Sequence, residues 1–96
     1  MRKYEIMYIL KADLDEAGRE AEMNNVQALL EENGAKVKNV DTKLGMRELA
    51  YPINDLTKGF YVVLKVDADE TALFQFNRKV KINPAVLRHL VVVDQQ

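Results

Sequence analysis

The sequence of 96 residues contains no cysteine, no serine and no tryptophan, and its single histidine is His89. The lack of cysteine excludes disulfide bonds, thiolate catalysis and zinc sites built on cysteine. A serine or cysteine nucleophile paired with a histidine base is also impossible. Every apolar run falls far short of the roughly 20 residues that span a membrane. The chain opens on a strand-like pattern, so we expect a cytoplasmic protein with neither a signal peptide nor an anchor.

The composition is that of an ordinary globular protein, with 48% apolar and 30% charged residues. At this length folding buries roughly 60–70% of the surface that an extended chain exposes. That is enough for a core between two layers, and we expect residues 1–96 to form a single domain.

The net charge of −1 is unevenly distributed along the chain. Residues 13–32 hold seven acidic residues and one arginine, a net charge of −6. The remainder holds 13 bases and 8 acids, a net charge of +5. The molecule can therefore present a basic face to an anionic partner. Its weak overall charge argues against tight binding to nucleic acid on its own, because contacts from lysine and arginine to phosphates supply most of that affinity.

Alternating apolar residues predict four β-strands. The third is the most apolar, which favours a central place in a sheet. Pro52 in the second strand cannot donate a ladder hydrogen bond, so this strand belongs at an edge. Gly45 predicts a bulge in it, and residues 56–59 predict a turn after it. The predicted strands are residues 2–10, 35–53, 60–66 and 86–93.

Two segments have the three- and four-residue spacing of helices. We expect Asp13 and Glu16 to form a capping box at the start of the first helix, and Gly34 to end it. Asp69 should cap the second helix, which the Asn83-Pro84 step ends. The apolar stripes are Met23, Val26, Leu29 and Leu30 in the first helix, and Leu73, Phe76 and Val80 in the second.

The element order is β-α-β-β-α-β, which predicts an α+β fold of the ferredoxin-like type. Right-handed crossovers place the first and third strands at the centre, in the order 4-1-3-2. The antiparallel sheet then carries two helices on one face and leaves the other face open.

Two motifs suggest chemistry but have plainer explanations. His89 has no partner at metal-ligand spacing, so an ordinary, partly exposed polar role is favoured. Residues 58–61, Lys-Gly-Phe-Tyr, partly resemble the third-strand motif of RNA-recognition modules. However, the strand parity puts Phe60 on the more apolar face, which favours a place in the core over base stacking.

Basic residues gather in the second half of the chain. Arg78, Lys79 and Lys81 end the second predicted helix, where cations complement the helix dipole. That explanation does not cover Arg88 and His89 in the last strand, or Arg2 and Lys3 in the first. Because these two strands are neighbours in the predicted sheet, we expect the four residues to form one phosphate-contacting patch.

Residues 45–54, Gly-Met-Arg-Glu-Leu-Ala-Tyr-Pro-Ile-Asn, resemble the signature of the bacterial small-ribosomal-subunit protein six family. That signature reads glycine, any, basic, polar, leucine, serine or alanine, tyrosine, any, isoleucine, polar. Residues 2–5 and 87–89 are similar to the family's opening and closing segments. One departure is Leu44, where many members have tryptophan.

The resemblance implies a ferredoxin-like structural protein of the small subunit, with no enzymatic activity, cofactor or metal. Family members bind the central domain of small-subunit ribosomal RNA as a heterodimer with small-subunit protein eighteen. The expected RNA-facing residues are Arg2, Lys3, Lys81, Arg88 and His89. The expected partner-facing residues are Arg47, Leu49, Tyr51 and Tyr61. Leu49 and Tyr51, together with Ile53, have an equally good explanation as half-buried residues that hold the edge strand.

Two other classes remain open on the sequence. An independent RNA-recognition module would need stacking aromatics on the open face. A small ferredoxin-like enzyme or ligand-binding regulator would need a pocket with convergent polar groups, for which the sequence offers no nucleophile or base.

Overall fold

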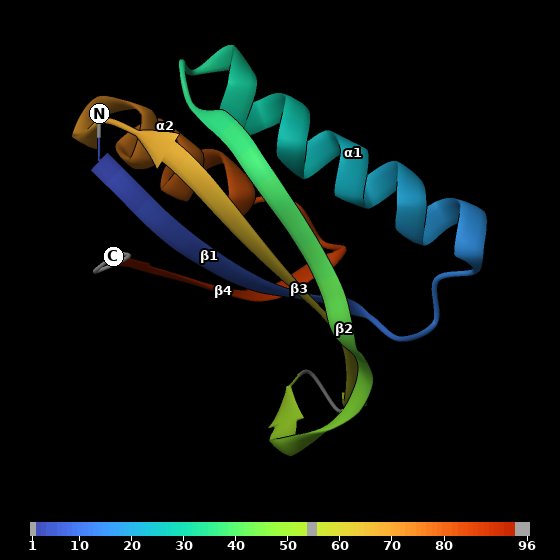
Figure 1. Cartoon of the computed structure of the whole chain (residues 1–96). Coiled ribbons are helices and arrows are strands. Elements are labelled where there is room, and N and C mark those ends of the chain that lie inside the picture. Colours follow the sequence, from blue (N-terminus) through green and yellow to red (C-terminus); the bar gives the residue numbers. More distant parts are fainter. Residues whose placement is uncertain (1, 54–55, 94–96) are drawn as a thin grey trace.

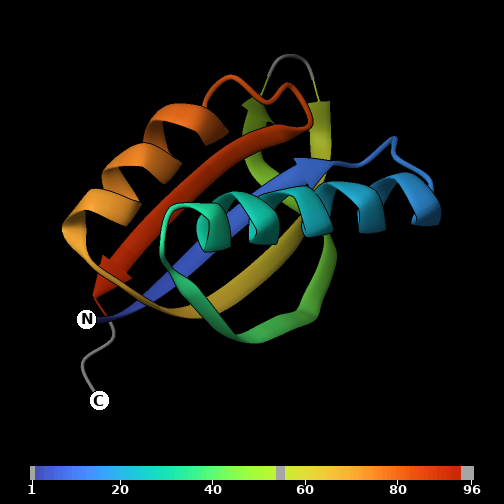
Figure 2. The ribbon, with the colours of Figure 1, turned by 90° about the horizontal axis from the view of Figure 1, so that it is seen from above.

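A four-stranded antiparallel sheet carries both helices on one face in the computed structural model, which describes residues 2–53 and 56–93 (Figures 1 and 2). The strand order is β2-β3-β1-β4, so the predicted ferredoxin-like fold is confirmed. Strand β3 is central and Pro52 lies on an edge strand, also as predicted. The elements are β1 (Arg2–Lys11), α1 (Glu16–Glu32), β2 (Lys36–Ile53), β3 (Leu56–Ala68), α2 (Glu70–Val80) and β4 (Val86–Val93).

The core lies between the sheet and the helices. Alternate residues of β1 and β3 point toward the helices, and the apolar stripes of α1 and α2 pack onto them. Phe76 of α2 is fully buried, as are Leu30 of α1 and Ile6 of β1. The remaining fully buried or nearly buried residues of this cluster include Tyr4, Tyr8, Leu10, Val26, Val62, Leu64, Val66, Ala72, Leu73 and Val80.

Tyr8 is the one polar side chain of the core whose hydroxyl has no hydrogen-bond partner among the described residues. Burial raises the pKa of this phenol well above its ordinary value, and the nearby charge of Glu22 adds to the shift. The hydroxyl therefore stays protonated and takes no part in acid–base chemistry near neutral pH.

The helix ends follow the expected capping rules with one correction. Asp69 caps α2 as predicted, since its carboxylate accepts a hydrogen bond from the Ala72 amide at 2.8 Å. Gly34 ends α1 with a φ of 94°, also as predicted. The prediction that Asp13 caps α1 is wrong. Residue 13 belongs to the turn that leaves β1, and Asp15 accepts from the Gly18 amide at 2.7 Å instead.

The long β2–β3 hairpin corrects a second prediction. Gly45 has a φ of 59° at a shift in the register, which confirms the bulge. Residues 56–59 are part of β3 rather than a turn, with Leu56 paired to Ile53. Gly59 is needed for a different reason, because a Cβ there would collide with the side chain of Ile9. This glycine permits close packing across the sheet instead of a reversal of the chain.

Within residues 2–53 and 56–93, neither helix has the length and apolarity that crossing a bilayer requires.

Candidate nucleic-acid and partner interface

The sheet face that neither helix covers, here called the open face, has an apolar centre. Directly paired residues of an antiparallel sheet lie on the same face. Met7 of β1 pairs with Val63 of β3 and Leu90 of β4, and Ile9 pairs with Tyr61 in the same way. Leu90 is 55% exposed, which is unusual for a leucine in the middle of a strand. The open face thus offers an apolar surface to a partner.

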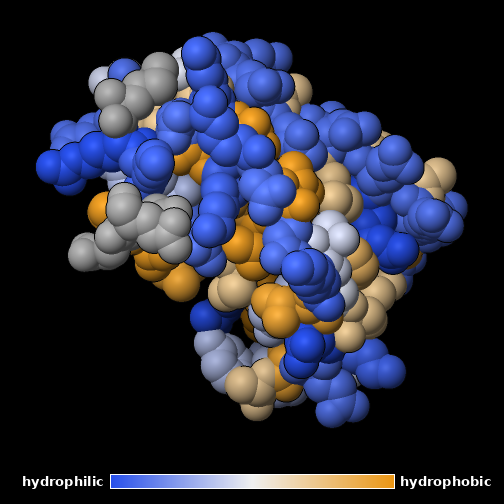
Figure 3. All heavy atoms as spheres, in the orientation of Figure 1, coloured by the Kyte–Doolittle hydropathy of each residue, from blue (hydrophilic) through white to orange (hydrophobic). Residues whose placement is uncertain are grey.

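The distal end of the β2–β3 hairpin curls toward the open face, on the side away from the helices (Figure 1). The space-filling view shows a hollow between this end and the body of the molecule (Figure 3). A hollow of about 240 Å³ lies on the open face, here called the open-face hollow. Its lining residues are Met7, Ile9, Arg88, His89 and Leu90.

A cation–π contact links the hairpin to β4 at this hollow. The guanidinium of Arg88 lies 4.9 Å from the centre of the Tyr51 ring. Arg88 pairs with Ile9 and therefore lies on the open face. A residue expected to face a protein partner and one expected to face RNA are thus in direct contact. Such contacts stabilise exposed side chains by about 0.5–1 kcal/mol, enough to favour one orientation of Arg88.

The other expected partner-facing residues lie close to this contact. Tyr61 is half-buried beside Ile9 on the open face. The side chain of Leu49 lies next to Gly59, as does that of Ile9. A Cβ built at Gly59 would be 3.4 Å from a methyl group of Leu49. Arg47 donates from Nε to the Leu44 carbonyl at 3.0 Å, which fixes part of its guanidinium to its own strand. Asn54, the last residue of the signature, lies outside the described residues.

The expectation that the basic residues of β1 and β4 form one patch is wrong. The two strands are neighbours but run antiparallel, so Arg88 pairs with Ile9 whereas Tyr4 pairs with Val93. Arg2 and Lys3 therefore lie at the opposite end of the sheet from Arg88, about 20 Å away at roughly 3.3 Å per residue. Any RNA that contacts both ends must extend along the sheet.

His89 lies on the other face from Arg88, since adjacent strand residues alternate. Its Nε2 lies 3.1 Å from Oδ1 of Asn77 in α2, and its ring meets the edge of Phe76 at 5.9 Å between centroids. Burial lowers the pKa of His89, and the charge of Lys81 lowers it further. His89 is therefore a neutral, half-buried side chain between α2 and β4 near neutral pH, and Lys81 is the positive charge near it.

The lowered pKa of His89 predicts a pH-dependent stability. The ordinary pKa of histidine is 6.5. Below about that pH the unfolded chain binds a proton at this residue more readily than the folded chain does, so stability falls as the pH drops from about 7 to about 5. Urea unfolding across this range should show a weaker pH dependence for His89→Gln than for the unsubstituted chain. Equal slopes for the two proteins would contradict the assignment.

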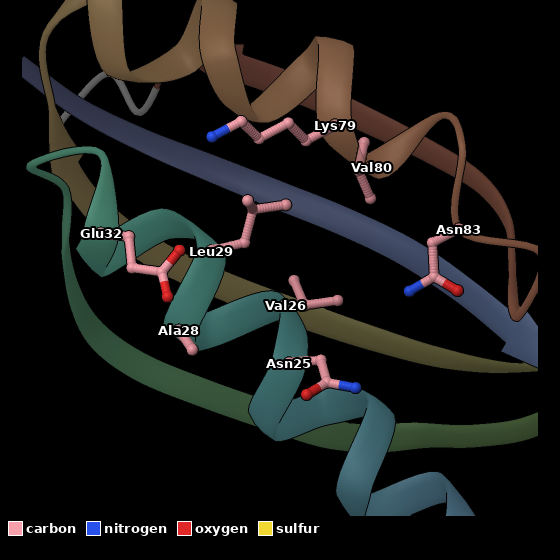
Figure 4. Close-up of a pocket in the computed structure, with 8 residues that line it drawn as sticks. All are labelled: Asn25, Val26, Ala28, Leu29, Glu32, Lys79, Val80 and Asn83. Atoms are coloured by element: carbon pink, nitrogen blue, oxygen red, sulfur yellow. The ribbon is translucent and has the colours of Figure 1, made fainter.

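A further hollow of about 260 Å³ lies between the two helices (Figure 4). Glu22 links its two sides, because the Asn83 side chain donates to this carboxylate at 3.0 Å and the Asn25 side chain donates at 3.2 Å. The hollow lies between α1 and the end of α2, and two of its polar residues, Asn25 and Asn83, both donate to Glu22. The residues around it are Asn25, Val26, Ala28, Leu29, Glu32, Lys79, Val80 and Asn83.

The structure disfavours a base-stacking platform of the RNA-recognition type. Phe60 pairs with Leu10 and so lies on the helix side of the sheet, as its parity predicted. There its ring contacts the guanidinium of Arg19, 4.4 Å from the ring centre. In the part of the chain that the structure describes, no three histidine, aspartate or glutamate residues gather as candidate metal ligands.

Sequence reasoning missed the residues that form the centre of the open face. Met7 and Ile9 of β1 and Leu90 of β4 line the open-face hollow. Their signal was present, since both strands are apolar at odd as well as even positions. In this fold the helices cover only one face of the sheet. Strands that are apolar on both faces therefore indicate that the open face is a binding surface.

Comparison with known proteins gives a consistent result. The family model described as "Ribosomal protein S6" matches residues 3–93. The curated protein "Small ribosomal subunit protein bS6" of Shouchella clausii (strain KSM-K16) is 46% identical over 96 residues, which is 100% of both chains. The crystal structure of 30S ribosomal protein S6 from Thermotoga maritima is similar, with a TM-score of 0.89 and 28% identity. That match covers 97% of this chain and 87% of the other.

Proposed function

This chain belongs to the ribosomal protein S6 family, whose members are structural proteins of the small ribosomal subunit, and on that premise we propose a specific role in assembly. It binds the central domain of small-subunit ribosomal RNA as one half of a heterodimer with small-subunit protein eighteen. The family is not enzymatic, and its members are cytoplasmic and ribosome-associated in bacteria.

The charge distribution supports binding as a pair rather than alone. With a net charge of −1, the chain has little attraction for RNA beyond its local basic groups. Affinity for RNA grows with the number of phosphates that lysine and arginine neutralise. A basic partner supplies the missing charge, and electrostatic complementarity then fixes the register of the complex.

The open face supports a protein partner of apolar character. Its centre is apolar at Met7, Ile9 and Leu90, and charged residues of both signs lie on the same face, among them Arg88, Lys65 and Glu5. An interface with an apolar centre and a charged rim is typical of protein heterodimers. The edge of β4 lies next to this face and can add main-chain hydrogen bonds to a partner strand.

The contact between Tyr51 and Arg88 is the observation that carries the proposal. A partner that covers Tyr51 also buries one side of the Arg88 guanidinium and leaves its N–H groups directed outward. Burial strengthens a cation–π contact from about 1 to about 2 kcal/mol. Partner binding therefore holds Arg88 in the orientation that contacts a phosphate, which explains why the two binding events belong together.

The double variant Arg2→Ala, Arg88→Ala tests the RNA-facing residues. We expect it to reduce the slope of log affinity against log salt concentration by about two, because each phosphate contact contributes about one. The measurement is binding of the heterodimer to a central-domain RNA fragment across a range of salt concentrations. The fold should be unaffected, since both residues are exposed.

The control is Lys38→Ala, Lys43→Ala, which removes two positive charges from β2 at the opposite edge of the sheet, one of them in an ion pair with Asp67 at 3.7 Å. Its slope should equal that of the unsubstituted heterodimer. If the two double variants have the same slope, Arg2 and Arg88 do not contact RNA.

A further inference from the structure

The outer surface of α2 carries apolar side chains that the core does not use. Ile82 is 82% exposed and Phe74 is 60% exposed, the two highest values among the exposed large hydrophobic residues of the described chain. Residues four and eight positions apart lie on one side of a helix. Phe74 and Arg78 have this spacing, and Lys81, which caps the helix, is three positions after Arg78. Glu70, four positions before Phe74, lies on the same side. Ile82 follows the end of α2. Phe74, Arg78 and Lys81 are called the α2 outer face below.

The α2 outer face lies in the most basic part of the chain. The last turn of α2 and its cap contain Arg78, Lys79 and Lys81, whereas the acidic residues Asp69 and Glu70 lie at the start of the helix. The guanidinium of Arg78 lies 5.8 Å from the centre of the Phe74 ring. The helix dipole accounts for basic residues in the last turn of α2. It does not account for the exposed phenylalanine beside them.

We propose that the α2 outer face is a second RNA-contacting surface, distinct from Arg2 and Arg88. Arg78 and Lys81 contact phosphates, and the ring of Phe74 stacks on an unpaired base. The inference rests on the proposed function and extends it to a helix face that the sequence prediction left out, apart from Lys81. Asn77 of α2 joins the helix to β4 through its contact with His89 at 3.1 Å.

Charge complementarity favours RNA over a protein as the occupant. Arg78, Lys79 and Lys81 at the end of α2 outnumber the one acidic residue of this side, Glu70, and such an excess of positive charge suits a polyanion. An aromatic ring beside basic residues is the combination found in proteins that bind unpaired nucleotides, where every base offers a flat surface to stack on. An apolar protein surface would bury the charges of Arg78 and Lys81 without a counter-charge, which is unfavourable.

Substitution of Phe74 tests the stacking contact. Loss of one aromatic platform weakens binding by about five- to a hundredfold, so Phe74→Ala should reduce RNA affinity of the heterodimer by about tenfold. Phe74→Trp should retain the affinity. The chain has no tryptophan, so this variant contains a single indole whose fluorescence a stacked base quenches. Unchanged affinity of Phe74→Ala, together with unchanged emission of Phe74→Trp on saturation with RNA, would overturn the proposal.

Substitution of the two bases tests the phosphate contacts. Arg78→Gln, Lys81→Gln should reduce the salt slope by about two, whereas Lys38→Gln, Lys43→Gln should leave it unchanged. If Phe74→Ala instead weakens formation of the heterodimer in the absence of RNA, the face contacts the protein partner and the proposal is wrong.

Binding of the unsubstituted heterodimer separates the proposed function from the role of α2. If the unsubstituted heterodimer does not bind the central-domain fragment, the proposed function is wrong. If it binds, and Arg2→Ala, Arg88→Ala weakens it while the α2 variants do not, only the inference about α2 is overturned.

Discussion

Replacement of Phe76 by alanine is expected to lower the free energy of unfolding by about 3–5 kcal/mol. The ring is fully buried between α2 and the sheet and contacts His89 edge to face. Its loss removes apolar burial and leaves a cavity that the packed strands cannot close. Domains of this size are stable by only about 5–15 kcal/mol in total. The variant should therefore unfold at a much lower urea concentration, as followed by circular dichroism.

Phe74 provides a matched control on the same helix. Phe74→Ala makes the same chemical change two residues away, at a side chain that is 60% exposed. A surface substitution of this kind changes stability by about 0.5 kcal/mol or less. The two variants should thus differ in both properties. Phe76→Ala should have a much lower free energy of unfolding, whereas Phe74→Ala should keep its stability and bind RNA more weakly. A similar loss of stability in both would mean that Phe74 packs into the core.

Replacement of Tyr51 by alanine is expected to weaken the heterodimer by about 2 kcal/mol, or roughly 30-fold in Kd. Tyrosine is enriched among hot-spot residues, and here its ring also contacts Arg88 beside the open-face hollow. Tyr51 is 54% exposed in the isolated chain, so its removal should change the melting temperature little. Titration calorimetry with small-subunit protein eighteen measures the affinity, and thermal unfolding of the isolated chain measures the stability.

Tyr51→Phe separates the ring from the hydroxyl. It keeps the aromatic face that contacts Arg88 at 4.9 Å and should retain most of the affinity. If Tyr51→Ala lowers the melting temperature and leaves the affinity intact, Tyr51 is a structural residue of the edge strand. The sequence left that alternative open.

The fold could be predicted because two signals agree along the chain. These are the spacing of the apolar residues and the positions of the residues that begin or end helices and strands. The alternation in β1, the stripe of α2 and the cap at Asp69 each point to one element, and the element order then limits the topology. The errors arose where one residue type has two uses. Gly59 reads as a turn residue but is required by the closeness of Ile9, a contact with a residue 50 positions away.

The candidate site was less predictable because it depends on strand direction and on hairpin curvature. Arg2 and Arg88 are on adjacent strands, yet antiparallel pairing puts them at opposite ends. The contact of Tyr51 with Arg88 depends on how far the hairpin curls beyond the bulge at Gly45, which no local pattern specifies. By contrast, the exposed position of Phe74 follows from helical spacing, since it lies outside the stripe of Leu73, Phe76 and Val80.

The pairing of β1 with β4 has a consequence for synthesis of the chain. The ribosome makes β1 first and β4 last, and β1 reaches its other neighbour, β3, only across more than 40 intervening residues. Contacts this distant in sequence slow folding, because a long loop must close before they form. The apolar strand β1 therefore has no paired strand until β3, which ends at Ala68, has been synthesised. Nascent copies stalled before residue 86 would have an unfilled sheet edge beside β1, which makes them targets for chaperones and proteases.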